Sequence, residues 1–412
     1  MNFKKLIFTL LAAYCSIAQA AEKVTITVTN SLMTPRKEMV ETSLANVQRK
    51  LGATQDIVVT DANGKEMPSQ ATYDGKLIFL ADVPAKGRAI YQAHKGTPQK
   101  YEPKVTGRLF TERQDEFGWE NDKVAYRIYG HGVGVGYDIF NKNTTDLMLD
   151  YWYASEHDTT MRRAIKDLAQ RGYKGLADQV YNAYCYHINH GKGMDCYTVG
   201  PTLGGGGNAT LDAKGNLVMP QCYKSYKILD KGPLRFTVEL TYPEQQVAGE
   251  KVTEVRVVTL DAGSHFNRVS VSYKGLTKPV NLVAGIVIHQ SNPKAYVMDA
   301  KNGYMGYDDL GDASVYNPNY RDQLAKQMGH IFVGMLFPEK QLTTFFQPRQ
   351  KGIAIGHILA KATFRPRQAY TYYFGSAWDG NQSEGIHTFE TWKTFLSKAA
   401  QAVRTPLKVS VK

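Results

Sequence analysis

The sequence predicts a mainly β protein, a large antiparallel β-sandwich with a short helical insertion. Apolar and polar residues alternate cleanly in the middle of the chain, where Phe236, Val238, Leu240 and Tyr242 share one face of the segment 235–242. Period-two patterning with polar outer faces is typical of antiparallel sheets that pack on one side. One internal segment has helical spacing instead, and 412 residues are enough for a large core.

The first hundred residues predict an export signal followed by a small β-rich unit. Residues 1–20 combine a positive start, the apolar run LIFTLLAAY and an Ala-Gln-Ala cleavage site, as secretory signals do. We therefore expect a periplasmic or secreted protein. Residues 21–100 read as short strands and turns, and the polar, proline-containing residues 95–104 are a candidate linker. Residues 101–412 are predicted to form the main β-sandwich.

Helical segments are expected at two places in the main region. Residues 158–186 have helical spacing, and Gly172 and Gly175 are expected to divide them into two helices. A terminal helix is expected over residues 390–403. The expected strands lie at 235–242, 251–260, 267–273, 280–289, 331–337, 352–359 and 369–375.

The charge of the chain restricts its partners. The formal net charge is +12, which for an exported protein favours an anionic partner such as an acidic polysaccharide, although solubility alone explains it equally well. The sequence has no nucleic-acid-binding motif and, after the signal, no apolar run long enough to span a membrane. Neither nucleic acid nor a membrane span is therefore expected.

Three cysteines remain after the expected cleavage: Cys185, Cys196 and Cys222. One disulfide can form among them, and a bridge between Cys185 and Cys196 would stiffen the segment that they flank. No cysteine and histidine spacing indicates zinc, and nothing in the sequence requires a metal or another cofactor.

The segment YHINHGKGMDCYTVG, residues 186–200, is dense in titratable residues and glycine. Its glycines favour a loop, in which His187 and His190 can converge on one cavity and serve as general base or acid. Asp195 can orient a histidine. Tyr197 can transfer a proton if nearby cations such as Lys192 lower its pKa. The glycine run that follows, residues 200–208, is either an anion-binding loop or a simple turn.

A second dense patch covers residues 112–130. Trp119 can stack on a sugar ring while Glu120 and other acidic residues bind hydroxyls, and Arg127 lies on the strand that follows. A buried tryptophan under a solvated acidic surface is an equally good interpretation. A pair of acids such as Glu120 and Asp122 is also what a glycosidase requires.

Other histidines carry weaker signals. His131 lies in YGHGVGVG and is a candidate to line the same cavity. His289, His330 and His357 lie in apolar strands, where a hydrogen-bonded core or rim histidine is the more common case.

These segments together resemble a family of exported bacterial proteins known as a domain of unknown function. The blocks ERQDEFGWENDKVAYRIYG, YHINHGKGMDCYTVGPTLGGGG, KGPLRFTVELTY and VTLDAGSHFNRV occur in the family's order, and the resemblance covers nearly all of the mature chain. The family is associated with the breakdown of acidic polysaccharides and includes ulvan oligosaccharide dehydratases. The galactose-mutarotase-like supersandwich is one form of β-sandwich considered for this fold.

The resemblance carries two sets of positions onto this chain. They are Trp119, Glu120, Asn121 and Asp122 in the first block, and His187, His190, Gly191, Gly193, Asp195 and Tyr197 in the second. Lys192 departs from the acidic residue expected there, and the helical pair is longer than usual. Both departures affect the expected substrate, so ulvan itself is an open question.

The resemblance implies elimination of water from a non-reducing-end uronic acid of an acidic oligosaccharide, which leaves a 4,5-unsaturated uronate. Such a reaction needs a cation for the carboxylate, a base for the C5 proton and an acid for the C4 oxygen. Arg127 and Lys192 are candidate cations, with the glycine run as an alternative, and a histidine with Tyr197 is the candidate acid–base pair. A chain-cleaving lyase, a glycoside hydrolase and a non-catalytic glycan-binding protein are the alternatives.

Overall fold

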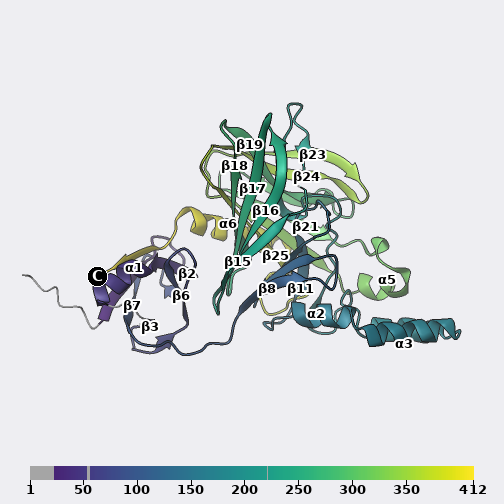
Figure 1. Ribbon diagram of the computed structural model, residues 1–412, viewed down its shortest axis with the longest axis horizontal. Coiled ribbons are helices and arrows are strands. Elements are labelled where there is room, and N and C mark those ends of the chain that lie inside the picture. The colour runs from purple at the N-terminus through teal and green to yellow at the C-terminus, as the bar shows by residue number, and fades with distance from the viewer. Residues whose placement is uncertain (1–22, 53–55, 220) are drawn as a thin grey trace, which may run out of the picture.

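The computed structural model describes residues 23–52, 56–219 and 221–412 and shows a smaller β unit beside a larger β-sandwich (Figure 1). The export signal expected at residues 1–20 lies outside the described residues. Strands predominate and pair antiparallel within five sheets, so the predicted mainly β sandwich fold is confirmed. None of the helices in the described ranges is both long and apolar enough to cross a membrane.

The smaller unit is built from the N-terminal strands and closed by the last strand of the chain. Its sheets have the orders β26-β1-β7-β3-β4 and β2-β6-β5, and α1 shares their core. The elements are β1 (Lys23–Thr29), β2 (Arg36–Ser43), α1 (Leu44–Leu51), β3 (Ile57–Thr60), β4 (Glu66–Met67), β5 (Ser69–Ala71), β6 (Lys76–Val83), β7 (Arg88–Lys95) and β26 (Lys408–Val411). Because β26 pairs with β1, the end of the chain lies in this unit rather than in the sandwich.

The larger unit contains three antiparallel sheets. The first has the order β12-β11-β10-β9-β8, with β8 (Val105–Phe110), β9 (Glu116–Asn121), β10 (Ala125–Ile128), β11 (Asp138–Lys142) and β12 (Gly193–Met194). The second has the order β14-β13-β19-β24-β23, with β13 (Gly205–Leu211), β14 (Leu217–Val218), β19 (Val280–His289), β23 (Thr343–Lys351) and β24 (Ala354–Phe364).

The third sheet has eight strands in the order β15-β16-β17-β18-β25-β22-β21-β20. They are β15 (Ser225–Lys231), β16 (Arg235–Val247), β17 (Glu250–Asp261), β18 (Phe266–Lys274), β20 (Tyr296–Asp299), β21 (Tyr304–Leu310), β22 (His330–Leu336) and β25 (Tyr370–Trp378). One core cluster joins residues from all three sheets of the larger unit.

The alternation in β16 gives the predicted core face but a different outer face. Phe236, Val238 and Leu240 are fully buried in the core of the sandwich, as the pattern predicts. Arg235, expected on a polar outer face, is buried too, because its guanidinium lies 2.6 Å from Asp261 and 2.7 Å from Glu41 of the smaller unit. The smaller unit therefore covers this end of the sheet.

The helices occupy the edges and one outer face of the sandwich. The predicted pair is present as α3 (Thr159–Gln170) and α4 (Lys174–Asn182), and α3 projects away from the body (Figure 1). The predicted terminal helix is α6 (Phe389–Arg404), whose Trp392 donates Nε1–H to the carbonyl oxygen of Val333 at 3.0 Å. The helices α2 (Leu149–Glu156) and α5 (Pro318–Ala325) and the 3₁₀ turn η1 (Ala313–Val315) have no counterpart in the prediction.

Glu384, between β25 and α6, ties together two other connections of the sandwich. It lies 2.7 Å from the Lys123 ammonium and 3.0 Å from His265 Nε2. Burial alone would raise the pKa of Glu384, but His265 and Lys123 lower it from 4.5 to about 2.

Glu384→Gln is therefore expected to lower the free energy of unfolding at neutral pH. A carboxyl with a depressed pKa in the folded state stabilises the fold above its unfolded pKa and loses that effect as pH falls. With allowance for solvent screening, we expect a loss on the order of 2 kcal/mol at pH 7 that shrinks from about pH 4.5 toward pH 2. Urea unfolding of the two proteins across this range measures the difference, and a difference independent of pH would contradict the assignment.

Candidate active site

The loop between α4 and β13, residues 183–204, carries the predicted catalytic residues. β12 anchors the loop by pairing with β11, which places Gly193 opposite Lys142. Gly193 has a φ of 116°, and a Cβ there would lie 2.0 Å from the carbonyl oxygen of Asn141. Only glycine fits this position. The loop therefore turns back sharply on itself, and His187 meets Asp195 across the turn.

His187 is oriented by the backbone within a group of aromatic rings. Its Nδ1 lies 2.6 Å from the carbonyl oxygen of Asp195, and its ring lies 4.5 Å from that of Tyr186 and 5.7 Å from that of Tyr320. Because a carbonyl oxygen can only accept, Nδ1 carries the proton and Nε2 keeps a free lone pair. The side chain as a whole is 16% exposed.

Several buried polar atoms of the loop and of the helices α2 and α5 have no hydrogen-bond partner within the described residues. They include atoms of Glu156 at the end of α2, Thr198 in the loop and Arg321 on α5. Arg321 Nη2 donates to the carbonyl oxygen of Tyr316 at 2.9 Å, and the Tyr316 ring meets His187 edge-on at 5.3 Å. Buried polar atoms are normally paired, so water or a polar ligand is the expected partner of these atoms.

Glu156 is connected to His187 through two tyrosines, of which Tyr320 belongs to α5. Tyr181 donates its hydroxyl to Glu156 Oε1 at 3.3 Å, and the Tyr181 ring contacts Tyr320, which stacks on His187. Burial raises the pKa of Glu156, although the charges of His187 and Arg162 oppose the shift. A carboxyl group with a raised pKa stays protonated to higher pH and can donate a proton.

Arg127 is buried beneath the loop, where its guanidinium binds neighbouring side chains. Its guanidinium donates to Asp138 at 2.7 Å, to Asp195 at 2.8 Å and to the Tyr129 hydroxyl at 2.9 Å, and it is buried. Burial, together with the neighbouring Asp195, raises the pKa of Asp138 to about 6 even though Arg127 opposes the shift. Arg127, expected to contact substrate, is engaged by two carboxylates, and Asp195, also expected there, is paired with Arg127 and contacts His187 through its backbone oxygen.

Trp119 and Glu120 are also structural. Trp119 is fully buried and donates Nε1–H to Asn267 at 2.7 Å, so its ring has no open face for a sugar. Glu120 is fully buried against the Lys142 ammonium at 2.7 Å. Asp122, the other candidate acid, accepts the backbone N–H of Gly263 at 2.6 Å. Within the expected sugar-binding patch, Trp119 and Glu120 therefore belong to a buried interaction between β9 and its neighbours.

The other loop residues lie in three different surroundings. His190 is exposed, and its Nε2 lies 3.1 Å from the carbonyl oxygen of Cys185. Lys192 is exposed and pairs with Asp146 at 2.7 Å. Tyr197 is buried, and burial raises its pKa well above the usual value, so the expectation that Lys192 lowers this pKa is wrong. Of the three candidate catalytic residues, only His187 combines a hydrogen bond to the backbone with partial exposure and with packing against neighbouring aromatic rings.

The glycine run after the loop packs tightly and has its N–H groups engaged. Gly205 donates to the carbonyl oxygen of Tyr137 at 2.9 Å, and Gly207 donates to that of Leu203 at the same distance. A Cβ on Gly206 would lie 2.3 Å from Phe374. The turn interpretation is the correct one, because these glycines allow close packing of β13 rather than binding of an anion.

A second polar cluster lies inside the sandwich beside Tyr197. His289 Nδ1 lies 2.9 Å from Asp309, and the Tyr197 ring lies 6.1 Å from that of His289. His357 accepts the backbone N–H of Leu203 at 3.2 Å, and burial lowers its pKa to about 3. These histidines are fully buried, so they support the position of the loop from within the core.

The sequence prediction missed Glu156 and Arg321. Arg321 lies on α5, which begins with Asn317 as N-cap and Pro318 in its first turn, a pair that is a recognisable start signal. Glu156 ends α2, whose N-terminus has no side-chain cap of its own. Neither residue lies near the loop in sequence, so only the folded chain connects them to His187, Arg321 through Tyr316 and Glu156 through Tyr181 and Tyr320.

The cysteines near this loop are free thiols, and Cys185 and Cys196 are both buried. Burial raises the pKa of the Cys185 thiol to about 11. Among the residues that the structure describes, no cluster of three or more histidine, cysteine, aspartate or glutamate side chains is arranged to hold a metal ion.

Comparison with known proteins gives a family assignment. The profile of the family described as a domain of unknown function, DUF4861, matches residues 28–409. The chain belongs to the DUF4861 family. A relative is the uncharacterized protein P7 of Formosa agariphila, which is 24% identical over 426 residues covering 95% of this chain and 94% of that protein.

Two solved structures are similar to this DUF4861 chain at 10% sequence identity. One is an α-mannosidase from Enterococcus faecalis V583, with a TM-score of 0.47 over 96% of this chain and 46% of that one. The other is a glycosyl hydrolase family 38 protein from Enterococcus faecalis, with a TM-score of 0.44 over 96% of this chain and 48% of that one. The chain thus spans about half the length of each.

Proposed function

We propose that this protein is an exported carbohydrate-active enzyme that eliminates water from a non-reducing-end uronic acid of acidic oligosaccharides. The observation that carries the proposal is His187, whose Nδ1 is fixed on a backbone carbonyl, so that Nε2 is the nitrogen left to act as a base in a side chain that is 16% exposed. The resemblance of the loop motif to that of ulvan oligosaccharide dehydratases and the net charge of +12 support the same substrate class.

Three groups around His187 match the three needs of the reaction. His187 Nε2 takes the C5 proton, the electrons of the broken C5–H bond form the C4–C5 double bond, and the C4–O bond breaks. We assign the uronate carboxylate to Arg321, whose buried Nε has no partner within the described residues, so that negative charge developing beside the carboxylate is neutralised. Glu156, whose pKa is raised by burial, donates its proton to the departing C4 oxygen, which leaves as water.

The glycoside hydrolase alternative is disfavoured because Glu120, one of its two candidate catalytic acids, is buried. Glu120 is fully buried against Lys142 and caps α2, so it is unavailable to a glycosidic bond. A chain-cleaving lyase would use the same base and acid and differs only in the group that leaves.

Incubation with oligosaccharides that end in a uronic acid tests the proposal. We expect a rise in ultraviolet absorbance from the conjugated product, and mass spectrometry should show loss of one water with the chain length unchanged. A rise with shorter chains would assign a lyase instead. Release of saturated sugars without a rise in absorbance would overturn elimination.

A further inference from the structure

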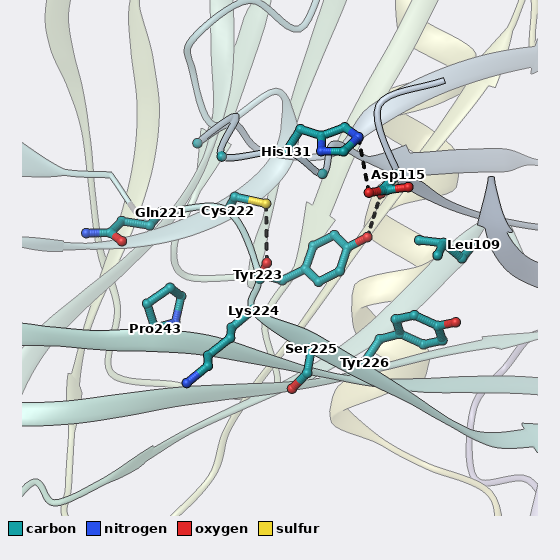
Figure 2. A pocket seen from close by; sticks show the side chains of 13 residues that line it. Leu109, Asp115, His131, Gln221, Cys222, Tyr223, Lys224, Ser225, Tyr226 and Pro243 are labelled. Carbon is teal, nitrogen blue, oxygen red and sulfur yellow. Dashed lines mark hydrogen bonds and ion pairs between the residues drawn. The ribbon is translucent and has the colours of Figure 1, made fainter. Parts of the chain in front are cut away.

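A surface cavity of about 1030 Å³ lies apart from the residues of the His187 loop (Figure 2). It is formed by the turn that contains Asp115, the loop that contains His131, and the segment 221–226 that leads into β15. Ligand sites commonly measure about 300–1,000 Å³, so this cavity is large enough for more than one sugar ring.

Two tyrosine rings of the cavity are held in place from behind. Tyr223 donates its hydroxyl to the carbonyl oxygen of Asp115 at 2.7 Å, and Figure 2 shows its ring across the middle of the cavity. Tyr226 is 41% exposed, and its ring packs 4.9 Å from that of Phe117, measured between centroids. Fixed, partly exposed aromatic rings offer a stacking surface that costs little entropy to order.

Polar groups stand beside these rings. His131 Nε2 lies 3.1 Å from Asp115 Oδ2, and both side chains are open to solvent. Lys224 also lines the cavity, is exposed, and forms no ion pair within the described part of the chain. Lys224 therefore brings a positive charge to the cavity that is not engaged by a neighbouring carboxylate among the described residues.

The backbone around the cavity adopts energetically unfavourable conformations. Gln114, Asp115 and His131 have φ values of 49°, 48° and 49°, in the left-handed region that non-glycine residues seldom occupy. A Cβ on Gly130 would lie 2.2 Å from the carbonyl oxygen of Asp115, so the two loops interlock there. Such conformations persist where the surroundings enforce them, often at ligand sites.

We propose that this cavity binds an acidic oligosaccharide, with Tyr226 and Tyr223 stacking on sugar rings, Asp115 and His131 bonding hydroxyls, and Lys224 pairing with a uronate carboxylate. The site is separate from the proposed catalytic residues. It would hold substrate chains near the enzyme whether or not they are being converted.

Titration calorimetry with a uronate hexasaccharide tests the proposal in a His187→Asn background, where turnover does not interfere. We expect Tyr226→Ala to raise the Kd of the cavity about tenfold. Lys224→Gln should weaken binding several-fold at low salt and less at high salt. Lys166→Gln, which changes an exposed lysine on α3, is the matched control and should change neither value.

Equal Kd values for the His187→Asn protein and its three variants would contradict the proposal that this cavity binds the oligosaccharide. Equal binding of a neutral hexasaccharide, unaffected by Lys224→Gln, would overturn the acidic specificity. Because binding is measured without turnover, failure to detect an unsaturated product would count against the proposed elimination and leave the test of this cavity intact.

Discussion

His187→Asn is expected to lower kcat for elimination by about 100- to 10,000-fold, the usual contribution of positioned acid–base catalysis. The asparagine amide can still donate to the carbonyl oxygen of Asp195, so the loop should keep its shape while the base at Nε2 is lost. KM should change little, because no group that holds the carboxylate is removed. Initial rates from product absorbance, with the unfolding midpoint as a check of the fold, measure the effect.

His190→Asn is the matched control in the same loop. His190 is exposed and contacts only a backbone carbonyl, so we expect nearly unchanged rates. The reverse result, a large loss for His190→Asn and a small one for His187→Asn, would assign the base to the other histidine of the motif. Equal small losses would place the chemistry outside this loop.

The parts of the fold that were predictable have short-range patterns. The alternation of Phe236, Val238 and Leu240 predicts the buried face of β16, and the spacing within residues 158–186 predicts α3 and α4. α2 could not be predicted in the same way. Its N-cap residue, Met148, makes no side-chain cap, and Glu120, almost thirty residues earlier, accepts the N–H groups of Met148 and Leu149 instead.

The site was predictable only as far as the loop motif reaches. Glycines and histidines in residues 186–197 indicate a turn with titratable groups, and in the structure this turn brings His187 to Asp195, while the catalytic role of His187 stays a prediction. Trp119 and Glu120 could not be assigned from the sequence. A dense polar patch predicts a binding surface when the residues that bury it lie far away in the sequence. The partner of Trp119 is Asn267, which no local pattern connects to it.

The second large effect is expected at the fully buried pair of Glu120 and Lys142. Glu120 Oε2 accepts from the Lys142 ammonium at 2.7 Å and from Met148 N–H at 2.8 Å, while Oε1 accepts from Leu149 N–H at 2.6 Å. Glu120→Gln leaves a buried ammonium without its counter-charge and replaces one acceptor of α2 with an amide donor. Breaking a buried pair on one side costs about 3–5 kcal/mol.

Two further variants test whether the loss of stability comes from the unpaired buried charge or from any substitution in this region. The double variant Glu120→Leu/Lys142→Met should be less destabilised than Glu120→Gln, because no unpaired charge remains buried. Lys192→Met breaks the exposed pair with Asp146 and should leave the unfolding midpoint unchanged. If Glu120→Gln unfolds at the wild-type urea concentration but loses activity, Glu120 contacts substrate after all. A lower midpoint with rates per folded molecule preserved instead gives it a structural role, which its complete burial favours.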